Sequence, residues 1–197
     1  LSCSPAVGGF FIVPFNDNRN NRKVAQFQIG FKGYIQLAIR SGVYKKLNAI
    51  SIKEGELISY DPLNDELKIE LIKDDDQRDK AKTIGYYAFF QHHNGFAKSI
   101  YWSKEKTEKH ALKYSKGYAK KKGYTFWEKD FDSMGLKTVL RQLLSKWGSL
   151  SPEMEDAMMN DMAVIENEKP VFIDNLKQET CASVALDSKV FGGEENE

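Results

Sequence analysis

The feature that most limits how this chain can fold is a wide apolar stripe between residues 130 and 147. Apolar side chains recur there every three or four residues, which predicts one face of a helix that Gly148 ends. Such a face has to be buried against another layer of structure. The stripe consists of Phe131, Met134, Leu136, Val139, Leu140, Leu143, Leu144 and Trp147.

The part of the chain before this helix has the pattern of strands. Short apolar or alternating runs are separated by turn-forming residues, and a polar loop between the first two predicts a β-hairpin. The short connections favour an antiparallel meander. The expected fold class is α+β, an antiparallel sheet with hairpins packed against the long C-terminal-side helix. The runs are residues 10–15, 24–28, 47–59, 66–72, 83–91 and 97–103.

Further helices are expected between and after these strands. Residues 29–41 have amphipathic spacing, and Gly42 is suited to a helix C-terminus. Gly30 and Gly33 are poor helix formers, and they predict that another backbone or a ligand comes close to the first turn. A second helix starts at Lys104 with Ser103 as its N-cap, and a short acidic helix follows Pro152 to about residue 162.

Charge is distributed unevenly along the chain. Residues 1–148 carry 26 Lys and Arg against 16 Asp and Glu, a net charge of +10, whereas residues 149–197 carry 3 against 12, a net charge of −9. A basic body with an acidic tail is typical of proteins that bind polyanions. We expect a folded core over residues 1–155 and an acidic, largely disordered tail over residues 156–197.

The two cysteines, Cys3 and Cys181, are far apart and indicate neither a disulfide framework nor a zinc site. The sequence contains neither a signal peptide pattern nor an apolar stretch of membrane-spanning length. These features favour a cytoplasmic location without membrane association.

Two helices place cations at a spacing suited to consecutive phosphates. Lys137, Thr138 and Arg141 form a polar strip on the long helix, and Lys32 and Arg40 lie two turns apart on the helix of residues 29–41. An ordinary solvated helix face would show the same pattern, so the spacing leaves both interpretations open.

Aromatic residues are interspersed with cations over residues 98–146. This range contains 13 Lys and Arg but only 5 Asp and Glu. Cations for phosphates and rings for stacking are what single-strand binding without sequence preference requires. Most of these rings are expected in the core. Phe126 or Trp127, just ahead of the long helix, is the expected base contact.

Signals for catalysis are weak. The sequence contains no phosphate-binding loop of the type G-x-x-x-x-G-K-[ST], which argues against an ATPase. Neither a nucleophile with its base nor a converging set of carboxylates can be argued from the spacings. We expect no enzyme activity, no cofactor and no metal.

Four segments in this order resemble the RecT family of phage and prophage single-strand annealing recombinases. They are GGFFIVPF, VAQFQIGFKGYIQLAIRSG, IGYYAFFQHHNGFAKSIYWSKE and FDSMGLKTVLRQLLSKWG. The resemblance covers roughly residues 1–155, and the strings QIGFKGYIQLAIRSG and MGLKTVLRQLLSKWG are its most specific parts. Members of this family have a helical region ahead of the first hairpin. This sequence lacks that region, so we expect its core to be N-terminally incomplete.

The resemblance implies ATP-independent annealing of complementary strands in phage-type homologous recombination. It also implies a Rad52-like annealing core, a homo-oligomer in the form of a ring or helical filament, and a partner 5′→3′ exonuclease. Single-stranded DNA and the annealed duplex would lie in a continuous basic groove. The residues carried over to this groove are Gln28, Lys32, Arg40, Lys137, Thr138, Arg141 and Lys146, with Tyr101 and Lys104 as further candidates.

Two other functions stay open. One is a metal-dependent DNA nuclease or a nuclease accessory protein, which would cleave single strands in Mg²⁺ and stop in chelator. The other is a structural, oligomer-forming phage protein, which would assemble without salt-sensitive DNA affinity.

Overall fold

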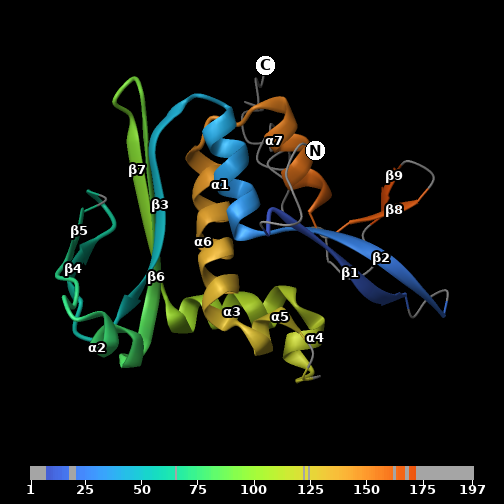
Figure 1. Cartoon of the computed structure of the whole chain (residues 1–197), viewed down its shortest axis with the longest axis horizontal. Coiled ribbons are helices and arrows are strands. Elements are labelled where there is room, and N and C mark those ends of the chain that lie inside the picture. Colours follow the sequence, from blue (N-terminus) through green and yellow to red (C-terminus); the bar gives the residue numbers. More distant parts are fainter. Residues whose placement is uncertain are drawn as a thin grey trace, which may run out of the picture.

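The computed structural model describes residues 8–17, 21–64, 66–121, 123, 125–161, 163–166 and 169–171 (Figure 1). Its elements along the chain are β1 (Phe10–Asp17), β2 (Arg22–Ile29), α1 (Phe31–Arg40), β3 (Tyr44–Lys53), β4 (Leu57–Asp61), β5 (Glu66–Ile69), α2 (Asp75–Lys80), β6 (Thr83–His92), β7 (Ala97–Ser103), α3 (Lys104–Tyr114), α4 (Lys116–Ala119), α5 (Phe126–Lys129), α6 (Phe131–Trp147), α7 (Pro152–Asn160), β8 (Val164–Glu166) and β9 (Lys169–Val171). The fold class is α+β with antiparallel sheets, as the sequence predicts.

The centre of the molecule is an antiparallel sheet in the order β3-β6-β7 with α6 packed on one face (Figure 1). Alternate residues of β6 point at the helix, and Tyr86 and Phe90 among them are fully buried. Gly135 of α6 lies against the ring of Tyr86, where a larger side chain would overlap the ring. Because the glycine makes room for the ring, α6 packs closely on the sheet.

The long helix is confirmed, and its ends follow local rules. Asp130 caps α6 by accepting a hydrogen bond from the Ser133 backbone N–H at 3.0 Å. Ser103 caps α3 in the same way through the backbone N–H of Lys106. Gly42 follows α1 with φ +69°, the left-handed conformation that glycine adopts without a Cβ penalty.

Gly30 and Gly33 mark a close approach of another backbone, as expected. A Cβ at Gly30 would overlap the carbonyl oxygen of Gly8, and a Cβ at Gly33 would overlap that of Gly9. The Gly30 backbone N–H also donates to the Gly9 carbonyl at 3.0 Å. The chain ahead of β1 is therefore held directly against the first turn of α1.

The single strand expected over residues 47–59 is wrong. The chain turns at Gly55, whose φ is +89°, and separates β3 from β4. The Glu56 carboxylate beside this turn is fully buried, and it accepts hydrogen bonds from the Lys53 backbone N–H at 2.8 Å and the Arg78 side chain at 2.6 Å. A buried acidic residue with its own partners ends the strand, and strand periodicity does not reveal it.

The expected simple meander is also wrong. β4 pairs with β5 in a hairpin of its own, and β3 pairs with β6 instead of the next strand along the chain. Between these strands, residues 75–80 form the short helix α2, where turn-forming residues predict only a connection between strands. Asp74 caps it by accepting from the Gln77 backbone N–H at 2.9 Å.

The packed part of the chain continues past residue 155, where the core was expected to end. Met154, Ala157 and Met158 of α7 belong to the hydrophobic core, and Val164 of β8 pairs with Gln26 of β2. Residues 172–197, most of the expected tail, lie outside the described residues.

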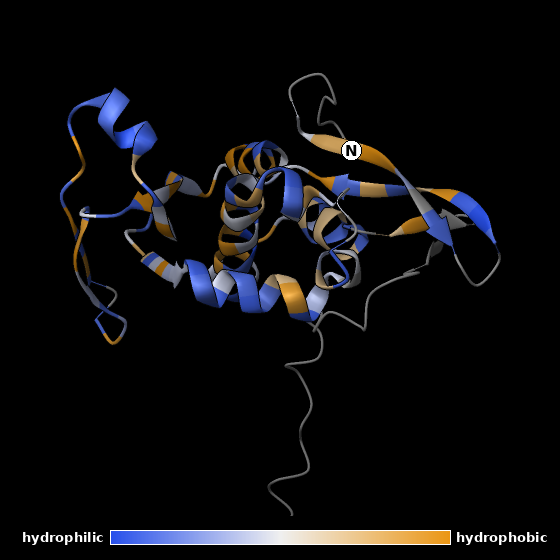
Figure 2. Cartoon of the chain, turned by 90° about the horizontal axis from the view of Figure 1, so that it is seen from below, coloured by the Kyte–Doolittle hydropathy of each residue, from blue (hydrophilic) through white to orange (hydrophobic). Residues whose placement is uncertain are grey.

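Figure 2 shows apolar stretches along the β1–β2 hairpin as well as in the helices of the core. In the described part of the chain, none of the helices has both the length and the apolar character needed to cross a membrane.

Candidate nucleic-acid interface

A buried carboxylate, Asp161, lies where the cations of α6 meet α1, β2 and the end of α7. Its side chain has an exposed fraction of 0%. The Ile29 backbone N–H donates to it at 2.8 Å and the Tyr34 hydroxyl at 2.9 Å. Lys137 Nζ lies 3.2 Å from Oδ2, and an Arg141 guanidinium nitrogen lies 3.3 Å from the same oxygen. One carboxylate therefore joins four elements of the fold.

The strip of Lys137, Thr138 and Arg141, expected to face solvent, is therefore largely buried. Lys137 and Thr138 have exposed fractions of 8% and 9%. Burial lowers the pKa of Lys137, although the charge of Asp161 opposes this shift. Arg141 keeps partial access to solvent, with its side chain 22% exposed. DNA contacts by these three residues stay a prediction.

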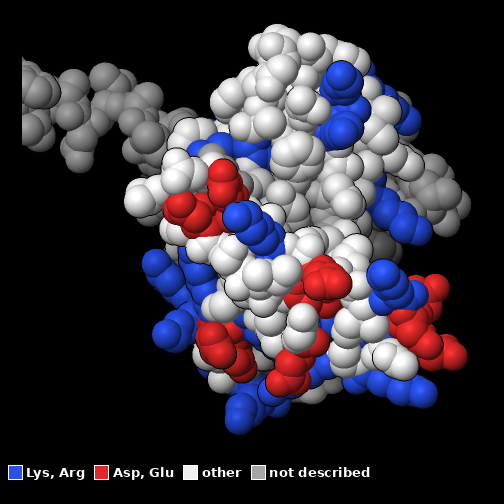
Figure 3. All heavy atoms as spheres, turned by 90° about the vertical axis from the view of Figure 1, so that its left-hand side faces the viewer, with Lys and Arg blue, Asp and Glu red and all other residues white. Residues whose placement is uncertain are grey.

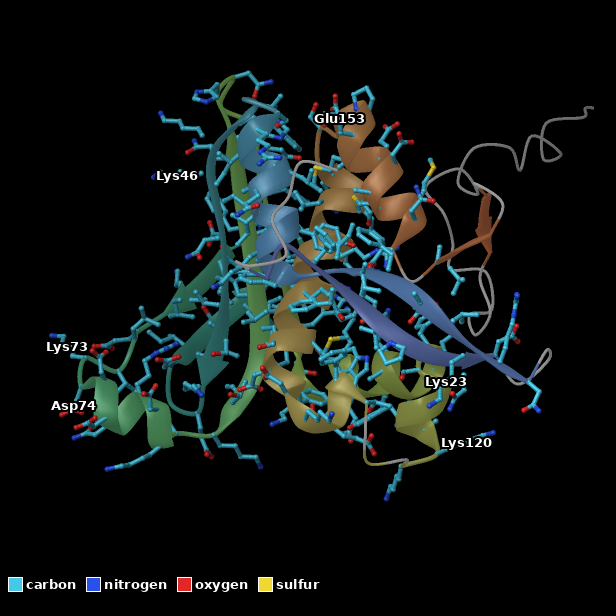
Figure 4. The ribbon with its side chains drawn as sticks, turned by 45° about the vertical axis from the view of Figure 1, so that its right-hand side comes forward. Lys23, Lys46, Lys73, Asp74, Lys120 and Glu153 are labelled. Carbon is cyan, nitrogen blue, oxygen red and sulfur yellow. The ribbon has the colours of Figure 1, made fainter. Side chains whose placement is uncertain are left out.

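The cations of α1 lie at the surface instead. Lys32 and Arg40 are both exposed, whereas the opposite face of the helix is buried against the core. Arg40 borders a hollow between α1 and α7, together with the carboxylates of Glu153 and Asp156. Figure 4 shows Glu153 at the start of α7. The Arg40 end of the row is therefore next to negative charge.

Two exposed phenylalanines meet next to the first turn of α1, which carries Lys32. Phe11 of β1 is 45% exposed and Phe126 of α5 is 41% exposed, and their ring centroids lie 6.2 Å apart. A Cβ added at Gly8 would lie 3.7 Å from the Phe11 ring on one side and 4.0 Å from the Lys32 side chain on the other. We call the two rings, together with the neighbouring Lys32, the aromatic patch.

The short helix α5 decides which of two adjacent aromatic residues is exposed. The Glu128 carboxylate holds its first turn by accepting hydrogen bonds from the Thr125 backbone N–H at 3.0 Å and from the Thr125 hydroxyl at 2.7 Å. Trp127 turns inward, is 7% exposed and packs edge-on against Phe131 with centroids 5.2 Å apart. Phe126 is left at the surface. Of the two expected base contacts, only Phe126 is accessible.

The other candidate residues are divided between the aromatic patch and the rest of the fold. Gln28 of β2 lies directly opposite Phe11 in the β1–β2 ladder, is half-buried and donates to the Gln26 side chain at 2.8 Å. Tyr101 of β7 packs on Tyr60, with ring centroids 5.3 Å apart. Lys104 Nζ lies 5.5 Å from the centroid of the Phe131 ring, and Lys146 is exposed near the end of α6. The fold therefore places Gln28 next to the aromatic patch, and Tyr101, Lys104 and Lys146 on other elements.

Charged side chains are exposed at both ends of the molecule. Figure 4 labels Lys23 of the β1–β2 hairpin and Lys120, which follows α4, on the side away from the β4–β5 hairpin, and both are exposed. Figure 3 shows the opposite end, where positive and negative side chains are interspersed.

A comparison with models of known protein families shows which family the chain belongs to. The model described as the RecT family matches residues 3–173. The chain belongs to the RecT family. This agrees with the resemblance found in the sequence, and the match extends beyond residue 155 into β8 and β9.

Two relatives show how much of a RecT-family protein this chain represents. It is 42% identical over 191 residues to the uncharacterized protein YqaK of Bacillus subtilis (strain 168), covering 97% of this chain and 60% of that protein. It is 28% identical over 163 residues to Protein RecT of Escherichia coli (strain K12), covering 82% of this chain and 57% of that protein. The chain therefore spans about 60% of the length of these relatives.

Two residues of this candidate site are not predicted by the sequence patterns. Phe11 falls in a predicted strand, and its neighbour Phe10 packs inward on Phe27 with ring centroids 5.5 Å apart. Strand alternation then turns Phe11 outward, and this signal was present in the sequence. Asp161 carried no such signal, because it is one acidic residue in an acidic segment.

Among the described residues, no group of three or more His, Cys, Asp or Glu side chains is arranged to hold a metal ion. The carboxylates at the start of α6 serve the fold. Asp130 caps the helix, and Asp132 accepts hydrogen bonds from the Tyr86 and Thr83 hydroxyls at 2.6 and 2.8 Å.

Proposed function

We propose that this protein binds single-stranded DNA and anneals complementary strands without ATP, in phage-type homologous recombination. The observation that carries the proposal is the aromatic patch, where two exposed rings lie beside an exposed lysine in a RecT-family chain. Exposed rings can stack on any base, and a cation beside them can pair with the adjoining phosphate.

In this mechanism, binding is electrostatic and largely independent of sequence. Lys32 neutralises phosphates next to the aromatic patch, and the exposed Lys146 and half-buried Lys104 contact phosphates farther along the strand. Counterions released from the DNA supply affinity that falls with salt. Bases held at the surface then pair with a complementary strand, so Watson–Crick pairing supplies the specificity.

The buried cations have an indirect part in this proposal. Lys137 and Arg141 bind Asp161, which also holds the Ile29 backbone N–H and the Tyr34 hydroxyl at the start of α1. They thereby fix the position of α1, and with it Lys32. A direct phosphate contact by Lys137 would require Asp161 to release it.

The assembly and partners belong to the same proposal. Neighbouring copies of the chain, in a ring or a helical filament, would extend the contact along the strand and make binding cooperative. A partner 5′→3′ exonuclease would supply the single strands in the cytoplasm. Both suggestions rest on membership of the RecT family.

The test is the annealing of two complementary fluorescent oligonucleotides, with and without the protein, over a salt series and without ATP. We expect acceleration that weakens as salt rises. Phe126→Ala and Lys32→Gln should each reduce DNA affinity by roughly tenfold, within the range for losing one base-stacking or phosphate contact.

Leu63→Ala is the matched control, because Leu63 is 91% exposed and lies on the β4–β5 hairpin, away from the aromatic patch. A folded protein that does not accelerate annealing would contradict the proposal. Cleavage of the oligonucleotides in Mg²⁺ that stops in chelator would favour a nuclease instead.

A further inference from the structure

Trp147, the last residue of α6, is exposed to an unusual degree for its size. It is 47% exposed, whereas Trp127 is 7% exposed and Trp102 is half-buried. Phe96, the residue before β7, is 45% exposed. Large aromatic side chains usually contribute most of their area to a core, so two exposed ones at one end of the fold indicate a contact surface.

Cations accompany these rings. Lys98 Nζ lies 4.5 Å from the centroid of the Trp147 ring, and Lys146 is exposed at the preceding position of α6. Lys98 pairs with Phe90 across β6 and β7, and Phe96 packs on the same Phe90 with centroids 5.8 Å apart. Phe96, Lys98, Lys146 and Trp147 make up what we call the Trp147 patch.

The Trp147 patch lies at the other end of α6 from the aromatic patch. Phe126 precedes the first residue of the helix by one short turn, and Trp147 is its last residue. A helix of 17 residues is about 25 Å long. At about 3.4 Å per nucleotide in a B-form strand, roughly seven nucleotides cover that length.

We propose that the Trp147 patch is a second contact for single-stranded DNA, in which a base stacks on Trp147 while Lys98 and Lys146 pair with the adjoining phosphates. The charge of the patch favours a polyanion over a protein surface, because both charged members are cations. This inference rests on the proposed function and adds a site at a distance from the aromatic patch.

The first experiment measures tryptophan fluorescence while oligo(dT) of about 20 nucleotides, longer than the span of α6, is added. The chain has three tryptophans, and stacking on the exposed one should quench its emission. Trp147→Phe keeps a ring for stacking. We expect it to bind more weakly than the unaltered protein but more tightly than Trp147→Ala, measured by the anisotropy of a labelled oligonucleotide, and to lose most of the quenching at saturating DNA.

Trp102→Phe is the matched control, because Trp102 is half-buried and packs on His110 with ring centroids 5.4 Å apart, outside the Trp147 patch. Its quenching should equal that of the unaltered protein. Undiminished quenching in Trp147→Phe would overturn the inference even if DNA binding is normal.

The second experiment compares affinities. Trp147→Ala should weaken binding of the same oligonucleotide about tenfold. Lys98→Gln combined with Lys146→Gln should reduce the slope of log affinity against log salt concentration. The folding of each variant is checked by thermal unfolding, and Leu63→Ala again serves as the control for an exposed apolar residue.

The outcomes separate the two proposals. If the unaltered protein shows no anisotropy change with DNA, the proposed function fails and this inference fails with it. If DNA binds and Phe126→Ala weakens it, but Trp147→Ala does not, only the inference fails. A smaller assembly size in Trp147→Ala with unchanged DNA affinity would assign the patch to contacts between copies and overturn the inference.

Discussion

The cations of α1 and α6 are both spaced at whole helical turns, but their surroundings are opposite. Lys32 and Arg40, two turns apart, are exposed on the outer face of α1. Lys137 and Arg141, one turn apart, bind the fully buried carboxylate of Asp161, and Lys137 is itself buried. Spacing at whole turns therefore places cations on one helix face but does not predict what that face meets.

The position of each helix in the fold explains the difference. α6 contacts the sheet, α1 and α3, so a polar side chain on most of its circumference meets protein. α1 has one outer face, and there its cations meet solvent (Figure 1). A buried cation needs a buried partner, and the end of α7 supplies it as Asp161.

Asp161→Ala should have the largest effect. It leaves the charges of Lys137 and Arg141 without a carboxylate, and breaking a buried pair in this way costs about 3–5 kcal/mol of the free energy of unfolding. Chemical denaturation measures the loss. Asp156→Ala, on the exposed side of α7, should change stability by less than about 0.5 kcal/mol. Equal effects of the two changes would refute the structural role of Asp161.

The stability losses caused by Lys137→Ala and Lys32→Ala compare a buried cation of α6 with an exposed cation of α1. Asp161 keeps three of its four partners when Lys137 is removed, so we expect a loss of about 2 kcal/mol, the value of a hydrogen bond to a charged group. Lys32→Ala should cost less than about 0.5 kcal/mol because its side chain is exposed. A neutral Lys137→Ala would show that the ion pair contributes little.

His110 reports whether the Arg141 charge acts inside the fold. Burial, followed by the charges of Arg141 and Lys113, lowers the pKa of His110 to about 4. The folded state therefore binds fewer protons than the unfolded state between pH 6.5 and 4, so stability should fall as the pH is lowered through this range. Because the ring is only partly buried, we expect a loss of about 1–2 kcal/mol.

The charge on Arg141 can be removed to check this cause. In an NMR titration, Arg141→Gln should raise the pKa of His110, whereas Arg40→Gln on the surface of α1 should leave it unchanged. A His110 pKa that is the same in all three proteins would show that the Arg141 charge does not contribute to the shift.

The salt dependence of DNA binding should differ least between variants of the two helices, but it tests most directly which lysine contacts DNA. Removing a lysine that contacts a phosphate lowers the slope of log affinity against log salt by about one. We expect this reduction for Lys32→Gln and an unchanged slope for Lys137→Met, measured by anisotropy. The reverse result would mean that Lys137 leaves Asp161 and contacts DNA.

Much of the fold follows from local sequence patterns. The apolar stripe predicted α6 and Ser103 predicted the start of α3, because each feature acts over a few neighbouring residues. The glycines of α1 predicted that a backbone comes close, but not that it would be that of Gly8 and Gly9. The break between β3 and β4 was not predicted, because it depends on Glu56 meeting Arg78 from α2.

The candidate site divides in the same way. The sequence by itself determined the kinds of side chain available, with lysines and aromatic rings at spacings suited to a nucleic-acid strand. Only the tertiary structure decided which of them face solvent. Lys137 is buried because Asp161, 24 residues later, lies beside it, and Phe126 is exposed because Trp127 fills the space against Phe131. Whether a side chain is buried depends on neighbours that are distant in sequence. The spacing of residues along one helix therefore cannot predict it.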